Sequence, residues 1–149
     1  MDIKLKKYFP AQTVGLYEKE GVVNFLFEHL DEFGDSKEDI RKCIEYALNS
    51  GMHPGGLIIT AWDGETIVGA TIINKTGMAG YIPENILVYI ATHGEYRGQG
   101  IGKKLMKKAF DEVEGDIALH VEPNNPAKHL YEKLGFTNKY LEMRWKRPS

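Results

Sequence analysis

Apolar residues recur along this chain with two different spacings, and each spacing predicts one type of secondary structure. Runs rich in apolar and β-branched residues, bounded by glycine, proline or acidic residues, indicate strands. Strands are expected at residues 3–8, 57–62, 65–74, 85–92, 116–121 and 137–146, the last as one long strand or two short ones. Asp63-Gly64 predicts a type I′ hairpin turn between the second and third of these. The nearly unbroken apolar run 85–92 is typical of a strand buried on both faces.

Helical spacing of apolar residues accounts for most of the remaining chain. Helices are expected around Val23–Leu30, from Ser36 to about Asn49, from Gly100 to about Val113 and from Pro126 to Leu134. Ser36 and Asn125 are good N-cap residues, and Gly135 is a good residue to end the last helix. The predicted order of elements is therefore β-α-α-β-β-β-α-β-α-β, without a linker, a repeat or a low-complexity tract.

Composition and charge narrow the function classes. The 149 residues suit one domain, expected over residues 1–149, and their 42% hydrophobic content and net charge of −2 are ordinary. This balance gives no reason to expect binding to nucleic acid or a membrane, and no apolar run approaches the roughly 20 residues that span a bilayer. The beginning of the chain also lacks the apolar core of a signal peptide.

The cysteine and histidine content predicts a reducing compartment and no metal site. Cys43 is the single cysteine, so an intrachain disulfide is impossible, and its place on an apolar helical stripe indicates a packed thiol. The five histidines show no metal-ligand spacing. A cytoplasmic location is therefore expected.

The most informative segment is Tyr96–Lys103, in which three glycines join an apolar strand to an amphipathic helix. A strand, a glycine turn and a helix start present free backbone N–H groups at the positive end of a helix dipole, an arrangement that binds phosphate. Two common phosphate loops are excluded by the residues present. The dinucleotide fingerprint needs a third glycine where Lys103 stands, and a P-loop needs a first glycine where Arg97 stands.

What remains is Arg97-x-x-Gly100-x-Gly102, which resembles the acyl-CoA pyrophosphate loop of the GNAT superfamily of N-acetyltransferases. The lead-in from residue 91 is also similar to that family, except that Gly94 replaces a frequent proline. A second block, residues 124–136, is similar to the family's Asn-x-x-Ala-x-x-Leu-Tyr-x-x-x-Gly-Phe. The resemblance implies an α/β fold with a mixed, mostly antiparallel central sheet and helices on both faces. It also implies a splayed pair of parallel strands, residues 85–92 and the strand around Leu119.

The resemblance implies acetyl-CoA as the co-substrate. The pantetheine arm would lie in the gap between the parted strands, and the N–H groups around Gly98–Lys103 would receive the diphosphate. The implied cofactor-binding residues are Ile90, Ala91, Thr92, Arg97, Gly98, Gln99, Gly100, Ile101, Gly102, Lys103, Asn124 and Tyr131. For two of them a purely structural role is the alternative, a helix cap for Asn124 and core packing for Tyr131.

The catalytic residues implied are Tyr131 as the general acid for the departing thiolate, and a general base on the preceding strand. A phenol is protonated at neutral pH and can donate a proton. His120 and Glu122 are the candidate bases, and strand alternation puts them on one face, opposite Leu119 and Val121. His93 and Tyr89 are further options for the base.

The leading functional hypothesis is direct acetyl transfer to a primary amine of a small molecule or peptide, in a ternary complex. The first alternative is a non-catalytic acyl-CoA-binding or sensor module. The second is a protein-interaction module built around the acid-rich residues 18–39, which would have no CoA affinity. The protein is expected to be a monomer, or a homodimer formed through Tyr140–Lys146 as an edge strand.

Overall fold

The chain is described by a computed structural model over residues 2–49, 51 and 53–149. Residues 1, 50 and 52, which belong to the domain expected over residues 1–149, lie outside the described residues. The strands are β1 (Ile3–Tyr8), β2 (Gly56–Asp63), β3 (Thr66–Lys75), β4 (Asn85–Thr92) and β5 (Ile117–Leu119). The helices are α1 (Leu16–His29), α2 (Lys37–Leu48), α3 (Ile101–Glu112) and α4 (Ala127–Lys133), with short 3₁₀ turns η1 (Asp31–Phe33) and η2 (Gly94–Tyr96).

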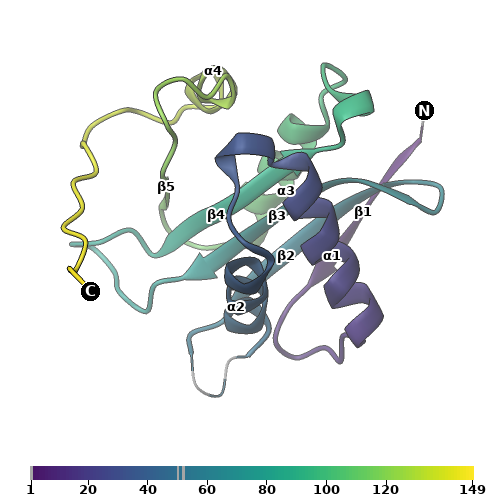
Figure 1. Cartoon of the computed structure of the whole chain (residues 1–149), viewed down its shortest axis with the longest axis horizontal. Helices are drawn as coiled ribbons and strands as arrows, with labels where there is room; N and C mark the ends of the chain where they lie inside the picture. The colour runs from purple at the N-terminus through teal and green to yellow at the C-terminus, as the bar shows by residue number, and fades with distance from the viewer. Residues whose placement is uncertain (1, 50, 52) are drawn as a thin grey trace.

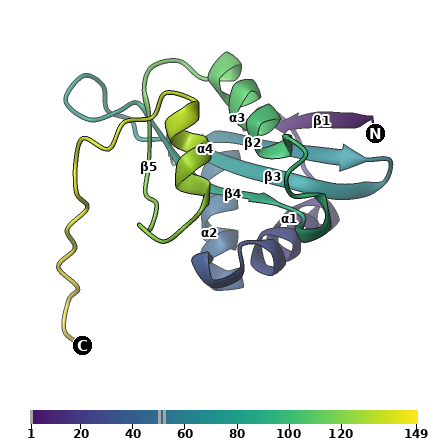
Figure 2. The same ribbon diagram turned by 90° about the horizontal axis from the view of Figure 1, so that it is seen from above.

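The five strands form one sheet in the order β1-β2-β3-β4-β5. Neighbouring strands are antiparallel except for β4 and β5, which are parallel. Helices α1 and α2 cover one face of the sheet, and α3 and α4 cover the other (Figures 1 and 2). The expected fold class, a mixed and mostly antiparallel sheet between two helical layers, is confirmed.

Each face of the sheet carries its own apolar core. The core under α1 and α2 includes Leu26, Ile40, Ile44 and Ile72, and the core under α3 includes Ile59, Ile73, Leu105 and Met106. All eight of these side chains are at most 1% exposed. Because a strand alternates its side chains between two faces, the central strands must be apolar at nearly every position, which explains their unbroken apolar runs.

The helix boundaries follow local signals in part. Ser36 caps α2 as predicted, because its hydroxyl accepts a hydrogen bond from the Asp39 N–H at 3.2 Å. Helix α1 begins at Leu16, earlier than the apolar pattern predicts. Only the second half of α1 is buried, so the first turns, where Leu16 and Tyr17 are exposed, give no apolar period to detect.

The hairpin turn between β2 and β3 differs from the prediction. Asp63 pairs with Thr66, so the loop consists of Gly64 and Glu65 and not of Asp63 and Gly64. Among the described residues only Gly64 of this loop has a positive φ, at 61°. Glycine at the first loop position with positive φ is typical of a type II′ turn, which replaces the expected type I′.

The strand predicted over residues 137–146 is wrong. The chain after α4 forms neither helix nor strand and runs away from the sheet beyond β5 (Figures 1 and 2). Leu141, Met143 and Trp145 alternate with charged residues, but they are 85%, 91% and 71% exposed. Alternation gives a segment the ability to form a strand, and a strand also needs an edge to pair with. Within the described residues, β5 forms the edge of the sheet next to β4; it has three residues and is shorter than its predicted range 116–121.

None of the helices within residues 2–49, 51 and 53–149 has the length and apolar character needed to cross a membrane.

Two glycines with different surroundings predict opposite effects of alanine on the free energy of unfolding. Gly69 lies under α3 in the core, and Gly21 lies on the exposed side of α1. A Cβ on Gly69 of β3 would lie 2.8 Å from Ile101 and 3.0 Å from Leu105, both buried in α3. We expect Gly69→Ala to lower the free energy of unfolding by about 1–3 kcal/mol through overpacking. At Gly21, no atom lies within 4 Å of the Cβ position. Because alanine favours the helical conformation more than glycine does, Gly21→Ala should raise the free energy of unfolding by about 0.5–1 kcal/mol. Urea denaturation of both variants measures the two effects, and equal midpoints would contradict this account of α3 packing.

Candidate active site

The parallel strands β4 and β5 stay together for a short distance and then part. Asn85, Ile86 and Leu87 pair with Ile117, Ala118 and Leu119, and no pairing follows beyond Leu87 in the described chain. From there β4 continues to Thr92 paired only with β3. The edge of β4 that would face β5 is therefore free over its last residues, as the expected splayed strand pair requires.

A β-bulge lies at the point where the strands part. Ile73 pairs with Leu87 and Ile72 pairs with Tyr89, so Val88 is an extra residue in β4. The bulge reverses the side-chain alternation, because Leu87 packs in the core under α3 whereas Tyr89 packs in the core under α1 and α2. A bulge bends a strand and increases its twist, which gives a physical reason for the separation of β4 from β5.

Asn85 fastens the other end of this strand pair. Its side chain is 1% exposed and donates hydrogen bonds to the carbonyls of Glu114 at 2.6 Å and Asp116 at 3.1 Å. Its backbone N–H also donates to the Asp116 carbonyl at 3.0 Å. These bonds hold the start of β5 against β4, so the strands can separate only beyond Leu87.

The glycine turn follows β4 and is open to solvent. Gly98 and Gly100 have φ angles of 80° and 81°, a left-handed conformation that strongly favours glycine. No atom lies within 4 Å of a Cβ built on either of them, so the space beside both residues is open. Gly102 has a different role, because its Cβ would lie 3.1 Å from Leu130 of α4. Two glycines therefore shape the turn, and the third allows α4 to approach α3.

The backbone of this turn presents unpaired donors. Within the described residues, the first hydrogen bond into α3 is donated by the Lys104 N–H to the Gly100 carbonyl, and no N–H of residues 98–103 donates a hydrogen bond. The N-cap residue Gly100 has no side chain that could satisfy them. Lys103, Lys104 and Lys107 form no ion pair with any described residue. Free N–H groups, the helix dipole and these lysines are the features that a phosphate-binding site needs, so the start of α3 is the candidate anion site.

The side chain of Arg97 is bound to the end of α1 and to η1. Its guanidinium donates to the carbonyl of His29 and to the carboxylate of Asp31, both at 3.0 Å. Arg97 thus connects the beginning of the glycine turn to the end of α1. Gln99, the next residue of the predicted set, is exposed between the two left-handed glycines.

The predicted residues of β4 lie along its free edge. Ala91 is buried under α1 and α2, whereas Ile90 and Thr92 are half-buried. Ala91 pairs with Ala70, and Thr92 pairs with Gly69, so these residues bind β3 on one side only. Their backbone is available on the side where β5 has moved away.

The second motif block places Tyr131 in the core and leaves Asn124 exposed. The Asn125 side chain, not that of Asn124, caps α4 by accepting the Ala127 N–H at 3.0 Å, as predicted. Tyr131 is 7% exposed, and burial raises the pKa of its phenol to about 12. No hydrogen bond among the described residues uses the Tyr131 hydroxyl. Tyr131 therefore packs in the core and keeps a protonated, uncommitted hydroxyl.

The candidate bases lie after β5, in a segment that is not a strand but still alternates exposed and half-buried residues. His120 and Glu122 are exposed, whereas Leu119 and Val121 are half-buried against the core under α3. His120 and Glu122 both follow the last paired residue of β5, on the segment that leaves β4. The structure thus keeps both side chains accessible near the opening of the strands.

Tyr89 cannot serve as the base. Its hydroxyl donates a hydrogen bond to the Asp35 carboxylate at 2.5 Å. Burial and this bond raise the pKa of Tyr89 far above its ordinary value, so the phenol keeps its proton. The other further option, His93, uses its Nδ1 atom to accept the Glu95 N–H at 3.1 Å.

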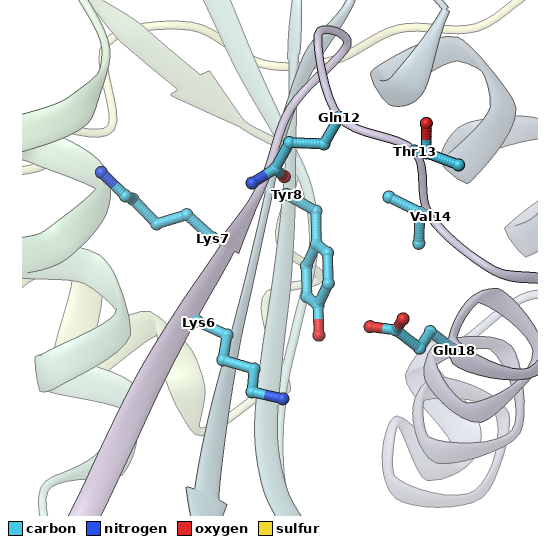
Figure 3. Close-up of a pocket in the computed structure, with 7 residues that line it drawn as sticks. All are labelled: Lys6, Lys7, Tyr8, Gln12, Thr13, Val14 and Glu18. Carbon is cyan, nitrogen blue, oxygen red and sulfur yellow. The ribbon is translucent and has the colours of Figure 1, made fainter.

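A hollow elsewhere on the molecule does not include the predicted residues. Figure 3 shows Lys6, Tyr8 and Glu18 around a hollow of about 510 Å³ between the end of β1 and the start of α1. Strand β1 forms the edge of the sheet opposite β5, so this hollow and the parted strands lie at different edges. The candidate active site is therefore the opening between β4 and β5, next to the glycine turn.

Comparison with known proteins decides the family. A family model described as an acetyltransferase (GNAT) domain matches residues 54–138, more than half of the chain. The matched region contains the parted strands, the glycine turn and α4. This chain belongs to the GNAT acetyltransferase family.

Individual relatives match over about half of this GNAT chain. Mycothiol acetyltransferase of Corynebacterium glutamicum is 34% identical over 86 residues, which are 54% of this chain and 28% of that protein. N-alpha-acetyltransferase 30 of Schizosaccharomyces pombe is 33% identical over 81 residues, which are 51% of this chain and 54% of that protein. The chain thus spans only part of the length of these relatives.

Similarity of fold extends over nearly the whole GNAT chain. A solved aminoglycoside N-acetyltransferase in complex with CoA superposes with a TM-score of 0.73 at 11% sequence identity. The superposition covers 99% of this chain and 96% of that one. At this identity the match shows a common fold, including the first half of the chain, which lacks the motifs.

Sequence reasoning missed three GNAT site neighbours, His29, Asp31 and Asp35. Each lies between the end of α1 and the start of α2, and each contacts β4 or the turn after it. They belong to an acid-rich region that reads as a solvated helix surface. No spacing within the sequence pairs them with Tyr89, Gly94 or Arg97, more than 50 residues away. Cys43 is a packed thiol, as the sequence predicts, and burial raises its pKa to about 12.

The burial of Tyr131 predicts a specific alkaline sensitivity. Its pKa of about 12 exceeds the ordinary tyrosine value of about 10, so the folded state favours the protonated phenol. This contribution to stability is present below about pH 10 and is lost as the pH rises towards about 12. Urea denaturation at stepwise pH should show that Tyr131→Phe loses stability less steeply than wild type in this range. Equal slopes would mean that Tyr131 titrates as an ordinary tyrosine.

Proposed function

We propose that this chain is an acetyl-CoA-dependent N-acetyltransferase that transfers acetyl directly to a primary amine of a small molecule or peptide. The observation that carries this proposal is the row of unpaired N–H groups over residues 98–103, next to the parted strands β4 and β5. Membership of the GNAT acetyltransferase family supports it. Names of the matching relatives, an N-alpha-acetyltransferase among them, support acetyl transfer to an amine.

The two parts of the cofactor would occupy two adjacent features. The diphosphate of acetyl-CoA would accept hydrogen bonds from the N–H groups of residues 98–103, with Lys103 and Lys104 as nearby positive charges. The pantetheine arm would extend along the free edge of β4 at Ile90–Thr92, where it replaces the missing strand neighbour. Asn124, exposed before α4, would contact the same arm from the other side of the opening.

The reaction requires removal of a proton from the amine before attack. A lysine-like amine with a pKa near 10.4 is only about one part in 10³ neutral at pH 7, a cost of roughly 4.6 kcal/mol. For an α-amine near 7.7–8.0 the cost is about 1–1.4 kcal/mol. A positioned base contributes about 10²–10⁴ in rate. His120 and Glu122 are proposed for this role because both are accessible after β5.

Transfer would then proceed without a covalent intermediate on the enzyme. The neutral nitrogen forms a bond to the thioester carbonyl carbon, and N–H groups of β4 stabilise the resulting oxyanion. Collapse of this intermediate breaks the carbon–sulfur bond and releases CoA thiolate. The nitrogen carries an extra proton once the new bond has formed, and it releases this proton to solvent. The Tyr131 hydroxyl donates its own proton to the sulfur and recovers one from solvent, while the base keeps the proton that it removed from the ammonium group before attack. The raised pKa of Tyr131 keeps this proton in place until the thiolate forms.

The competing function is an acyl-CoA-binding or sensor module without turnover. One observation favours it: within the described residues, no hydrogen bond fixes the side chain of His120 or Glu122, so neither base is held in position. Both functions share the same cofactor site. They differ only in whether an amine causes release of CoA thiol.

We also place the protein in the cytoplasm, where the single thiol of Cys43 would stay reduced. Its oligomeric state, a monomer or a homodimer, stays a prediction.

Cofactor binding is tested by thermal unfolding with acetyl-CoA. At a hundredfold excess over Kd, binding adds about 2.7 kcal/mol, which raises the Tm of a domain of this size by about 5–10 °C. Gly100→Val should abolish most of this shift, because a side chain at φ 81° distorts the turn and blocks close approach of the diphosphate. Gly94→Ala is the matched control, since a Cβ there has open space and lies outside the row of donors. An unshifted wild-type Tm would contradict the proposed function.

Catalysis is tested by Tyr131→Phe. We expect thiol release across a panel of amines to fall by about 10²–10⁴-fold in kcat, while the Kd of acetyl-CoA stays within about twofold. The control variant is Tyr140→Phe, because Tyr140 is 78% exposed and should leave both quantities unchanged. An unchanged kcat in Tyr131→Phe would remove Tyr131 from the mechanism. Cofactor binding without thiol release from any amine would instead favour the sensor module.

A further inference from the structure

Two histidines join the end of α1 to the turn that leads into the glycine loop. His29 is the last residue of α1, and His93 follows β4 directly. Their rings are in contact, with centroids 4.2 Å apart and planes tilted by 34°. Phe25 covers His29 at 4.7 Å, and Tyr96 contacts His93 edge-on at 5.4 Å. The pair is the packed contact between α1 and the 3₁₀ turn η2.

Both imidazoles act as hydrogen-bond acceptors. Nδ1 of His29 accepts the N–H of Gly94 at 3.2 Å, and Nδ1 of His93 accepts the N–H of Glu95 at 3.1 Å. A backbone N–H can only donate, so both Nδ1 atoms must lack a proton. Protonation of either ring converts its acceptor into a donor facing a donor. Protonation of both also brings two positive charges together at the contact distance of the rings.

Arg97 strengthens the same connection directly before Gly98, the first left-handed glycine of the turn. It reaches the His29 carbonyl and the Asp31 carboxylate, each at 3.0 Å. Asp31 is the non-glycine residue with positive φ, 55°, among the described residues. Such a conformation is unfavourable for most residues and persists where contacts hold it, here the ion pair with Arg97. The backbone from residue 93 to residue 97 is therefore fixed to α1 at three points.

We propose that His29 and His93 are positioning residues that hold turn η2, and with it the anion-binding N–H row, only while both imidazoles are neutral. This inference rests on the proposed function, because the held row of donors is the proposed diphosphate site. Acidification would release η2 from α1 and weaken cofactor binding. Neither histidine contacts the N–H groups of residues 98–103, so the effect on them is indirect. It is measured as a change in cofactor affinity.

The charged groups around the pair determine the direction of the effect. Burial lowers the pKa of His29, and the neighbouring His93 and Arg97 lower it further, against the opposing effect of Glu28 and Asp31. The Glu28 carboxylate lies 3.7 Å from His29 Nε2 and is exposed, so it compensates a charged ring only in part. A histidine with a lowered pKa stabilises the held turn above its ordinary pKa of about 6.5, and this stabilisation is lost as the pH falls below that value.

The test is the pH dependence of cofactor affinity, measured by isothermal titration calorimetry with CoA from about pH 5 to pH 8, the range in which histidine titrates. The 3′-phosphate of CoA itself titrates near pH 6, as other phosphomonoesters do. Dephospho-CoA, which lacks that group, is therefore the second ligand. We expect the wild-type Kd to rise with acid for both ligands, by up to about tenfold per pH unit for each linked proton.

Asparagine is the informative replacement, because its side-chain oxygen can take the place of Nδ1 as an acceptor and does not titrate. The variants His29→Asn and His93→Asn should each show a shallower pH profile. The double variant should bind dephospho-CoA near the wild-type neutral affinity, with a flat profile. His29→Phe, which keeps the packing and loses the acceptor, should bind weakly at every pH. His53→Gln is the control, since His53 stacks on Tyr46 away from the glycine turn and should leave the wild-type slope unchanged.

Three results would overturn the inference: a flat wild-type profile, a wild-type slope in the double variant, or lost binding in folded His29→Asn at neutral pH. Circular dichroism establishes that each variant is folded. Absence of CoA binding by wild type at every pH would count against the proposed function instead. In that case NMR of the ligand-free protein decides the inference. The amide proton shifts of Gly94 and Glu95 should change with acid together with the ring signals of His29 and His93, because these N–H groups donate to the two rings.

Discussion

The short parallel pairing of β4 with β5 is the constraint on which the candidate site depends. Asn85 holds the two strands together at one end, and the bulge at Val88 separates them three residues later. Each feature needs the other, since without Asn85 the strands could drift apart along their whole length, and without the bulge they would continue to pair. The result is a free strand edge inside a sheet whose two faces are already covered by helices. An extended ligand can use this edge as a strand would.

The glycine turn places hydrogen-bond donors beyond one end of the free edge of β4, so the two ends of the candidate site differ in chemistry. Strand β4 ends at Thr92, and within a few residues the chain turns through left-handed glycines into α3, so the free edge and the donors of α3 are consecutive in space. Gly102 allows α4 to approach α3 closely, and this brings Tyr131 of α4 into the core under α3. Under the proposed function, a long ligand with an anionic end would be held at that end, and its other end would reach the strand opening. The hydrogen-bond pattern of the backbone, more than any single side chain, specifies this orientation.

How much the sequence could predict differs between the two halves of the molecule. The glycine turn, Ser36 and Asn125 depend on contacts within a few residues, and local patterns predicted all three. The bulge at Val88 depends on the register between two strands, and residues 137–146 depend on a partner edge, so neither follows from alternation. His29, Asp31 and Asp35 contact residues more than 50 positions away and carry no spacing of their own. The sequence therefore predicted the glycine turn and the two helix caps, and it missed the bulge, the end of the chain and the three long-range contacts.

Under the proposed function, the cofactor and the acceptor would be recognised by different parts of the chain. The donors of residues 98–103 are backbone groups, so their chemistry depends on the glycines and on the start of α3. Three side chains between the end of α1 and the start of α2 contact β4 or the turn after it: Asp35 binds Tyr89, and His29 and Asp31 bind Gly94 and Arg97. These are charged or titratable, and they come from a segment that shares no motif with the family. Cofactor binding can thus stay constant while the charge beside the strand opening varies. In this chain the ion pair of Asp31 with Arg97 is neutral and Asp35 supplies a remaining negative charge, which under the proposed function would favour a cationic acceptor over an anionic one.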